Sequence, residues 1–430
     1  MAIKYSERNT LQPKERKGES QTHTCTIAHG IPQRYILCIL FLCIFLSVNA
    51  KSHTLSSQAQ ISLLTISPSD EEVYTVYGHS AIRIQDQPHQ IDLIFDYGRF
   101  SFSKPNFIYR FVKGETDYQL GISRFQDFLI EYQMRGSEVT EQILVLDSIG
   151  KAHIWETLLI NYQPQNREYR YNFFYDNCAT RPATIIAQHL NGQLQLPPFK
   201  QKISFRDIIN NCTRNQPWLT FGCDLVLGSP TDKPITAQEK MFLPIYLKEA
   251  FSQATIKQPD NTISKLVQSE QILIESITDD SVKKTTLFTP LYCCWFFFLL
   301  IAIITWLEWR KRSYYRWLDC LLFFITGIAG CVLFFLCFIS THPCIWPNWS
   351  IIWLQPFHLV AVILFAVKKL RKAADCYHFI NFAALMLFLA GWHFIPQHLN
   401  TAYIPLIMAI LLRSGYSVYR RIWNIGYEKY

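Results

Sequence analysis

The last third of the chain alternates long apolar runs with short polar segments. A transmembrane helix needs roughly 20 mostly apolar residues to cross the hydrocarbon core of a bilayer. Four runs approach that length, and a fifth is shorter and contains Pro405. The pattern therefore predicts an all-α membrane domain of about five transmembrane helices in residues 285–430. The runs are Leu287–Leu307, Leu318–Ser340, Ile351–Val367, Cys376–Phe394 and Thr401–Leu412.

Lys and Arg are concentrated in alternate segments that follow these runs. Four follow the first run, four the third and four the fifth, where the predicted tail begins with Arg413. The other two connections, Thr341–Ser350 and Ile395–Asn400, contain neither residue. Because positively charged loops stay in the cytoplasm, residues 51–284 and both uncharged loops are predicted to lie on the non-cytoplasmic side, which in a bacterial inner membrane is the periplasm. The buried helical core of a soluble protein would not predict this alternation.

The first 50 residues have the pattern of a leader. Arg34 precedes the apolar stretch Tyr35–Leu46, and the small residue Ala50 follows at a plausible cleavage point. The apolar stretch is short for a membrane-spanning helix, so a signal peptide is favoured over a permanent anchor. Either interpretation gives the same orientation for the rest of the chain.

Residues 51–256 mix two periodicities, which predicts an α+β domain large enough to have its own core. Alternating or short apolar runs predict strands, and longer amphipathic runs predict helices. Residues 257–284 are expected to be a linker to the membrane domain. The predicted strands are Gln60–Ser67, Val73–Gln85, Gln90–Tyr97, Val139–Asp147 and Tyr169–Tyr175, and the helices are Ser123–Arg135, Ile149–Tyr162 and Cys178–Leu190.

The formal charge of +8 first suggests a nucleic-acid partner, but its distribution excludes one. Residues 51–284 carry 23 basic and 26 acidic residues, whereas residues 285–430 carry 12 basic and only four acidic ones. The excess positive charge therefore lies in the membrane domain and reports topology, and the predicted periplasmic domain has no basic groove for DNA or RNA.

Four of the 13 cysteines are expected in the periplasm, at Cys178, Cys212, Cys223 and Cys344. Cys212 and Cys223 are close in sequence and can form a disulfide in an oxidising compartment. An unpaired Cys178 is then a candidate nucleophile. The sequence shows no metal-ligand spacing and no nucleotide-binding glycine loop, so no cofactor is expected.

Cys178 follows Asn177, a good N-cap residue, at the start of a predicted helix. A thiol there feels the positive end of the helix dipole and needs a base, usually His. His79 is the best candidate because it opens a strand directly after Gly78. Either residue alone is more often structural, as a strand His or a buried thiol. The combination favours catalysis, with the Cys178 N–H and the Asn177 side chain as possible oxyanion donors.

A predicted hairpin supplies the third member of this site. If Asp86 pairs with Ile91 across the turn, His79 lies opposite Gly98 and Asp96 is its diagonal neighbour on the same face. Asp96 can then orient the imidazole, whereas Asp92 lies too far along the strand. A register shift of one residue would reverse this assignment.

Three segments that contain these residues resemble the Lnb-type lipoprotein N-acyltransferases of Bacteroidetes. They are Tyr77–Arg83, Phe95–Phe100 and Phe174–Arg181. Further similar segments are Phe111–Gly114, Phe221–Ser229 and Phe242–Pro244 and, in the membrane domain, His342-Pro343, Asn348–Trp353, Pro356 and Pro396-Gln397. The three segments together are specific, and the resemblance covers roughly residues 60–420.

The resemblance implies a Cys–His site that takes an acyl chain from a membrane phospholipid as a thioester and passes it to the N-terminal amine of a lipoprotein diacylglyceryl-Cys. The order of His before Cys also resembles circularly permuted papain-like enzymes of the NlpC and lecithin–retinol acyltransferase groups. This sequence departs from a regular helix start at Pro182, whose missing N–H removes the bond to the Cys178 carbonyl. The helix is therefore expected to begin near Thr180.

Three further residues are candidate lipid contacts. Arg181 can hold a phosphate, although a solvated surface Arg is an equally good interpretation. His342 and Asn348 lie in an uncharged periplasmic loop and can reach head groups, but a role in loop structure is favoured. Two alternatives to acyl transfer remain, namely an NlpC-type cell-wall peptidase or amidase and a non-catalytic membrane-bound binding protein.

Overall fold

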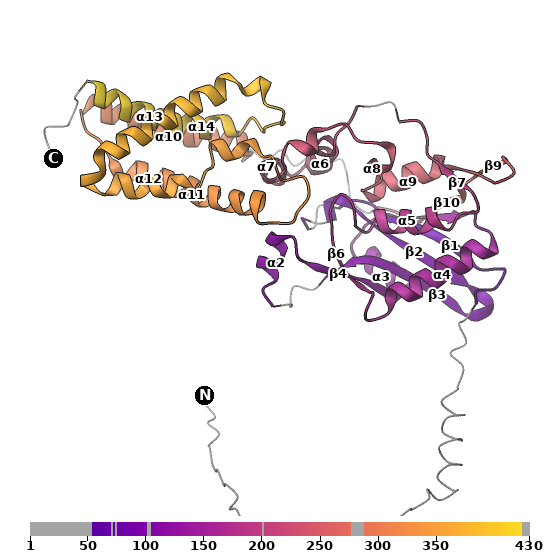
Figure 1. The fold of residues 1–430 in the computed structure, drawn as a ribbon. Helices are drawn as coiled ribbons and strands as arrows, with labels where there is room; N and C mark the ends of the chain where they lie inside the picture. Colours follow the sequence, from indigo (N-terminus) through magenta and orange to yellow (C-terminus); the bar gives the residue numbers. More distant parts are fainter. Residues whose placement is uncertain are drawn as a thin grey trace, which may run out of the picture. The chain divides into compact units, whose positions relative to one another are not determined.

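A computed structural model describes residues 54–69, 72–73, 75–100, 105–199, 202–276 and 288–423 (Figure 1). The predicted leader and signal peptide, residues 1–50, lie outside the described residues, as do residues 277–284 of the predicted linker. The described chain begins as a mixed α+β domain and continues as a helical bundle, which is the predicted fold class.

The first domain is built on a seven-stranded antiparallel sheet with the strand order β10-β5-β1-β2-β3-β4-β6. Strands β2 and β3 pair as predicted, with Asp86 opposite Ile91 and Ile82 opposite Phe95. The register therefore places Asp96 on the strand beside His79. The strands are β1 (Gln60–Ile66), β2 (His79–Asp86), β3 (Ile91–Arg99), β4 (Asp117–Arg124), β5 (Val139–Leu144), β6 (Glu168–Arg170) and β10 (Val267–Ile274).

Helices cover both faces of this sheet, so both faces bury apolar side chains. Helices α4 (Ser148–Tyr162), α5 (Thr180–Gln188) and α9 (Pro244–Gln253) contribute to the larger core, against alternate residues of the strands such as Ile82 and Phe95. Helix α3 (Phe125–Met134) packs on the other face, where Phe128 and Tyr132 meet Ala81 and Ile94. The period-2 alternation of the strands thus defines two separate cores.

Two strands of the seven-stranded sheet were not predicted. Strand β4 occupies the start of the predicted helix Ser123–Arg135, which begins only at Phe125. Strand β10 lies within the predicted linker 257–284, which is therefore shorter than expected. Most side chains of β10 are exposed, so the strand is held by backbone pairing with β5 and shows no apolar alternation. An edge strand of this kind leaves little hydrophobic signal in a sequence.

Smaller elements complete the first domain. Strands β7 (Gln193–Gln195), β8 (Thr255–Lys257) and β9 (Ile263–Lys265) form a second, three-stranded sheet. The remaining helices are α2 (Phe107–Lys113), α6 (Phe205–Thr213), α7 (Pro217–Val226) and α8 (Ala237–Lys240), with short 3₁₀ turns η1 (Thr75–Tyr77), η2 (Gln87–His89) and η3 (Ser229–Asp232).

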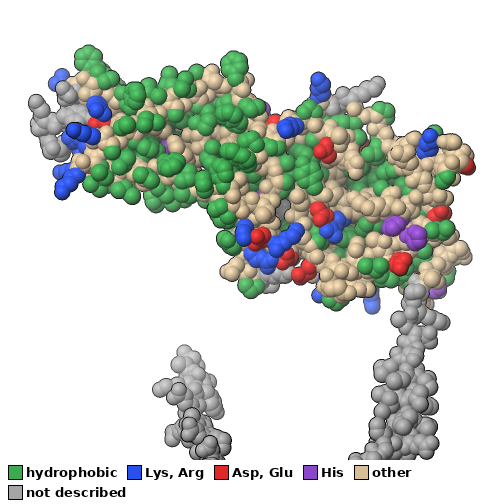
Figure 2. Space-filling view, viewed as in Figure 1, with side chains coloured by type: hydrophobic (Ala, Val, Ile, Leu, Met, Phe, Trp, Pro, Cys, Tyr) green, Lys and Arg blue, Asp and Glu red, His purple; other side chains and the backbone are tan. Residues whose placement is uncertain are grey.

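The second part of the described chain is an all-α bundle. Its helices are α10 (Pro290–Arg310), α11 (Arg316–Phe338), α12 (Phe357–Ala366), α13 (Arg371–Ala390) and α14 (Tyr403–Ile422), with the 3₁₀ turns η4 (Trp349–Ile352), η5 (Lys368–Leu370) and η6 (Trp392–Phe394). Helix α14 contacts α10 and α13, and α12 contacts α11 and α13. Figure 2 shows hydrophobic side chains covering this bundle, with Lys and Arg gathered at one end.

Four segments of the described chain are long and apolar enough to cross a membrane, namely Pro290–Arg310, Arg316–Phe338, Trp349–Ala366 and Lys368–Ala390. The expected fifth span, Thr401–Leu412, is the first part of the longer helix α14, whose second part carries three arginines. Arg413 was expected in a tail after this span, and this is wrong, because it lies within α14. Its buried guanidinium donates to Asp319 Oδ1 at 2.6 Å and also binds Glu308.

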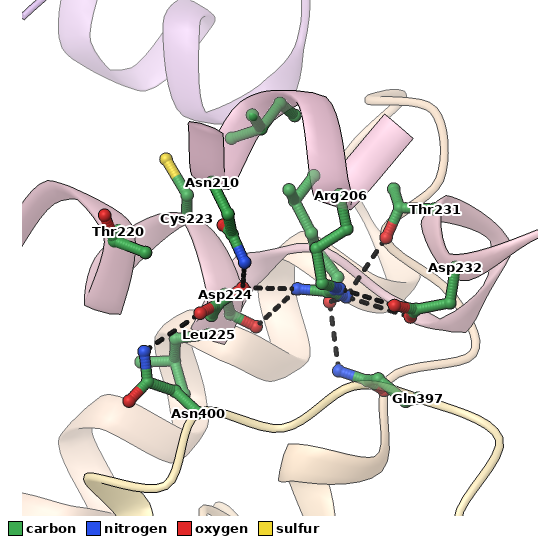
Figure 3. A network of polar contacts seen from close by, with 12 residues as sticks. Arg206, Asn210, Thr220, Cys223, Asp224, Leu225, Thr231, Asp232, Gln397 and Asn400 are labelled. Atoms are coloured by element: carbon green, nitrogen blue, oxygen red, sulfur yellow. Dashed lines mark hydrogen bonds and ion pairs between the residues drawn. The ribbon is translucent and has the colours of Figure 1, made fainter. Parts of the chain in front are cut away.

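A polar network joins the first domain to the bundle (Figure 3). Arg206 on α6 is 1% exposed and donates to Asp224 on α7 and to Asp232 on η3, at 3.0 and 2.8 Å. The second carboxylate oxygen of Asp224 accepts from Asn400 of the bundle at 2.9 Å. Gln397 donates to the Leu227 carbonyl at 3.0 Å. These bonds hold α7 against the periplasmic ends of the membrane helices.

Candidate functional site

Cys178 lies on the turn that leads from β6 into helix α5, which begins at Thr180 as predicted from Pro182. The side chain of Asn177 caps this turn, because its Oδ1 accepts from the Ala179 and Thr180 N–H groups at 2.8 and 2.9 Å. Cys178 is 9% exposed. In the described part of the chain, the structure records no acceptor for the Cys178 N–H. The turn therefore presents the thiol together with a backbone donor.

The carbonyl of Cys178 is satisfied by a side chain from another element. Pro182 has no N–H to offer this carbonyl, and the Ser80 hydroxyl donates to it at 2.6 Å. Ser80 is fully buried on β2, directly after His79. This single hydrogen bond ties the turn that carries the nucleophile to the strand that carries the base, and the sequence analysis did not identify it.

Gly98 is the point at which the two candidate catalytic residues meet. A Cβ at this position would lie 3.6 Å from Cys178 Cβ and 3.9 Å from His79 Cε1. Gly98 has a φ of +100° and lies at a break in the β3–β4 register, between Tyr97 and Arg99. Such bulges are frequent next to active sites because they redirect the strand. Only glycine fits this backbone and leaves the space above it open.

His79 is held by Asp96 through a hydrogen bond of 2.5 Å between Nε2 and Oδ1. The second oxygen of Asp96 accepts from Arg99 Nε at 2.8 Å. The His79 side chain is 23% exposed and that of Asp96 only 8%. Since Asp96 engages Nε2, the other ring nitrogen, Nδ1, is the one available for proton exchange with a thiol.

Charge and burial act against each other on the pKa of this pair. Burial would lower the pKa of His79, but Asp96 outweighs it and holds the pKa well above its usual value. Burial would likewise raise the pKa of Asp96, but His79 and Arg99 hold it below its usual value. Asp96 therefore favours proton uptake by His79, which makes this imidazole a stronger base than an ordinary one.

Asn177 has a structural role in this arrangement. Its Nδ2 donates to the Phe173 carbonyl at 2.6 Å and to the Phe242 carbonyl at 2.8 Å. Both amide hydrogens are used, so the side chain does not point a free donor at an oxyanion. The Cys178 N–H is the better candidate for that role.

Arg181 forms a bidentate pair with Asp176, at 2.5 and 2.8 Å, and its guanidinium lies 3.5 Å from the centre of the Tyr169 ring. Its charge is therefore balanced within the domain. Arg181 and Asp176 line a shallow cavity of about 240 Å³. These surroundings favour a structural role for the Arg181 side chain over contact with a phosphate.

The two loop residues proposed as lipid contacts differ in the structure. Asn348 is 2% exposed, and its amide donates to the Leu225 and Val226 carbonyls at 2.9 and 3.2 Å. A head-group contact for Asn348 is therefore wrong. His342 is partly exposed and binds the Phe111 carbonyl through Nε2 at 2.7 Å. Its role is to hold helix α2.

The disulfide considered for Cys212 and Cys223 is not formed, because both are free thiols in the structure. The sulfur of Cys223 instead lies 3.7 Å from the Tyr77 hydroxyl. Burial raises the pKa of Cys212 to about 11, which leaves it an unreactive thiol. Among the described residues, no group of three or more His, Cys, Asp and Glu side chains could hold a metal ion.

Sequence reasoning also missed the aromatic residues beside the thiol. The Tyr171 ring lies 4.0 Å from the same Cβ position at Gly98, and Tyr118 stacks on Tyr171 with 4.1 Å between ring centres. Burial raises the pKa of Tyr118 to about 12, so its hydroxyl stays neutral. The only feature of the sequence that could have indicated these residues was the run of aromatics around residue 171, which was interpreted as a strand.

Comparison with known families matched both parts of the chain. Residues 49–211 match the family model described as the Lnb N-terminal periplasmic domain. Residues 282–422 match the model described as the Lnb transmembrane domain. Comparison with curated proteins and with solved structures found no match.

Proposed function

Because the chain belongs to the Lnb family, we propose that it is a thiol-dependent acyltransferase that modifies lipoproteins. It is a multi-pass inner-membrane protein with a periplasmic domain, and the family assignment points to lipoprotein processing with lipid involvement. The observation that carries the proposal is the meeting of Cys178 and His79 at Gly98, with Asp96 bonded to the far side of the imidazole.

In the first half of the reaction, Cys178 attacks the ester carbonyl of a phospholipid acyl chain. His79 Nδ1 takes the thiol proton, and the Cys178 N–H donates to the oxyanion that develops. Collapse of the tetrahedral intermediate breaks the ester C–O bond, and His79 returns the proton to the departing lysophospholipid alkoxide. The acyl chain remains on Cys178 as a thioester.

In the second half, the α-amine of a lipoprotein diacylglyceryl-Cys attacks the thioester carbonyl. His79 accepts the proton that the amine loses as the amide bond forms, and the Cys178 sulfur departs. The proton then returns to the sulfur, which restores the resting site. Asp96 remains ionised throughout and stabilises the imidazolium in both halves.

The order of strand His before helix Cys supports a circularly permuted papain-like site. In this proposal, β2 supplies the base, β3 the orienting carboxylate and α5 the nucleophile. Both candidate acyl donor and lipoprotein acceptor are anchored in the bilayer, and the family's transmembrane domain gives a lipid substrate a physical route that a soluble cell-wall peptidase would not need.

The proposal is tested with Cys178→Ala in cells, using the mass of N-terminal lipopeptides as readout. We expect lipoproteins to lose one acyl chain in this variant. Cys212→Ala is the matched control, because it removes a partly buried thiol from the same domain. Unchanged lipopeptides in Cys178→Ala would refute acyl transfer. Altered muropeptides would favour a peptidase, and no change in either would favour a non-catalytic protein.

A further inference from the structure

Helix α2 carries an unusual number of exposed apolar side chains for its seven residues. Ile108 is 78% exposed, Tyr109 is 55% and Phe111 is 48%. A helix of a water-soluble domain normally turns such residues inward. These three side chains form an apolar face, which we call the α2 face.

Helix α2 is fixed to the periplasmic end of a membrane span. The Thr341 N–H donates to the Lys113 carbonyl at 2.9 Å, and His342 binds the Phe111 carbonyl. Gly114, the C-cap of α2, allows this contact, because a Cβ there would lie 2.7 Å from Thr341 Oγ1. Two segments that resemble family motifs, Phe111–Gly114 and His342-Pro343, therefore dock on each other.

Helix α2 lies at the level of the bilayer surface because it contacts Thr341 and His342. Thr341 and His342 follow α11 directly, within one of the two loops without Lys or Arg. The ring of Tyr109 lies 6.1 Å from that of Phe335 in the last turn of α11. Phe338 and Ile339, at the same end of the span, are about half exposed. The α2 face thus continues the apolar surface of a membrane-spanning helix.

The charges on α2 are neutralised within the domain. Arg110 forms an ion pair with Asp117, and Lys113 pairs with Glu115 at 2.8 Å. With its cations paired, the helix has little net attraction for anionic head groups. Apolar insertion is therefore the interaction that its surface favours.

A row of aromatic rings leads from α2 to the site. Phe111 stacks on Phe107, and Phe107 on Phe100, each with 6.0 Å between ring centres. Phe100 contacts Tyr118 at 5.1 Å, and Tyr118 stacks on Tyr171, which borders Gly98. These packed rings form a continuous apolar connection from α2 to the residues beside the thiol.

We infer that the α2 face inserts into the outer leaflet of the bilayer and is the place where the acyl chain of a phospholipid enters the site. The insertion stands on the geometry of α2 and α11. The entry of the substrate rests in addition on the proposed acyl transfer by Cys178.

The insertion is tested with a photo-crosslinking amino acid at position 108 of the full chain, reconstituted in vesicles of phosphatidylethanolamine and phosphatidylglycerol. Position 263 is the control, because Ile263 on β9 is 65% exposed and lies at the other end of the periplasmic domain from α2 (Figure 1). We expect about tenfold more lipid adduct at 108 than at 263, with little dependence on salt. Equal labelling at the two positions would overturn the insertion.

The entry route is tested with Ile108→Asp against Ile263→Asp, which place the same charge on two exposed positions. We expect loading of Cys178 from vesicle phospholipid to fall about tenfold in Ile108→Asp alone, because a carboxylate opposes insertion. Alkylation of Cys178 by water-soluble iodoacetamide should stay within about twofold in both variants, which shows an intact site. Unchanged loading in Ile108→Asp would overturn the entry route. If the unaltered protein is never loaded, the acyltransfer proposal fails, while the crosslinking result still decides the insertion.

Discussion

The clusters around Arg206 and His79 in the first domain both pair a basic side chain with Asp, but they differ in how many of their hydrogen-bonding atoms have partners. The guanidinium of Arg206 has all its donors engaged, because it pairs with Asp224 and Asp232 and also donates to the Leu227 carbonyl at 2.8 Å (Figure 3). His79 has one ring nitrogen bonded to Asp96, and the described part of the chain records no hydrogen bond for the other. A cluster whose hydrogen-bonding atoms are all engaged, here called saturated, stabilises a fold. A partly accessible cluster in which one ring nitrogen has no partner, here called incomplete, can exchange a proton.

The largest expected effect is that of removing the base from the incomplete cluster. We expect His79→Gln to slow thioester formation about a thousandfold, since general acid–base catalysis contributes factors of this order. The melting temperature should change little, because the imidazole is partly exposed. Single-turnover loading of Cys178 from phospholipid measures the rate. A decrease of less than about tenfold in this loading rate would contradict the role of His79 as base.

Removing Arg206 from the saturated cluster should lower the stability of the protein but leave the reactivity of Cys178 unchanged. Arg206→Met leaves the buried carboxylate of Asp224 without its cation, and we expect a loss of about 3 kcal/mol in the free energy of unfolding. The rate of Cys178 alkylation in the folded fraction should not change. Arg135→Met, which removes an exposed pair with Glu131, is the matched control and should cost under about 1 kcal/mol. Equal costs for both variants, measured by unfolding in detergent, would contradict the comparison.

The dependence of the loading rate on pH tests how Asp96 acts on His79 in the incomplete cluster. Asp96 raises the pKa of His79 against the lowering effect of burial, so the imidazolium persists to higher pH than usual. A folded-state pKa that is raised stabilises the protein fully at low pH, and this stabilisation is lost as the pH rises through that pKa. In Asp96→Asn, only Tyr132 and Cys178 still oppose the effect of burial on the pKa of His79, so the imidazole loses its proton at lower pH.

We therefore expect Asp96→Asn to move the alkaline limb of the loading rate to lower pH and to reduce the maximal rate by about tenfold. Loading rates measured across the alkaline range in both proteins check the direction. Asp92→Asn is the control, since Asp92 lies on the same strand and pairs with Arg83. A shift to higher pH in Asp96→Asn would show that Asp96 does not act on His79.

The smallest effect is expected at the bulge. Gly98→Ala requires a positive φ that costs an L-residue about 1 kcal/mol, and it places a methyl group between Cys178 and His79. Iodoacetamide should therefore alkylate Cys178 more slowly, with a small decrease in melting temperature. Gly222→Ala is the control, because no atom lies within 4 Å of a Cβ there. Faster alkylation in Gly98→Ala would exclude the proposed crowding.

Part of the site followed from local rules. The turn at Asp86–Ile91 determines the register of β2 and β3, and that register brings Asp96 beside His79. The missing N–H of Pro182 predicted that α5 starts at Thr180, which leaves Cys178 on the cap turn. Both predictions concern neighbours in sequence, where strand period and backbone chemistry are sufficient.

Other features depend on partners far away in the chain. Arg413 has the sequence context of a cytoplasmic tail, but α14 continues through it because Glu308 and Asp319 neutralise it inside the bundle. Asn348 was a candidate head-group contact, but its amide donates to the carbonyls of the last two residues of α7. No local pattern distinguishes a charge or amide with such a partner from one in solvent.

The sequence by itself determined the presence of a membrane domain, the periplasmic location and α+β class of the first domain, and the candidate pair of His79 and Cys178, because hydropathy, charge and short motifs act locally. Only the tertiary structure decided how the pair meets, through the bulge at Gly98 and the bond from Ser80 to the Cys178 carbonyl. It also decided that α2 rests on the end of α11. The bond from Ser80 and the contact of α2 with α11 join residues about a hundred or more positions apart, and their formation depends on packing that no short stretch of sequence contains.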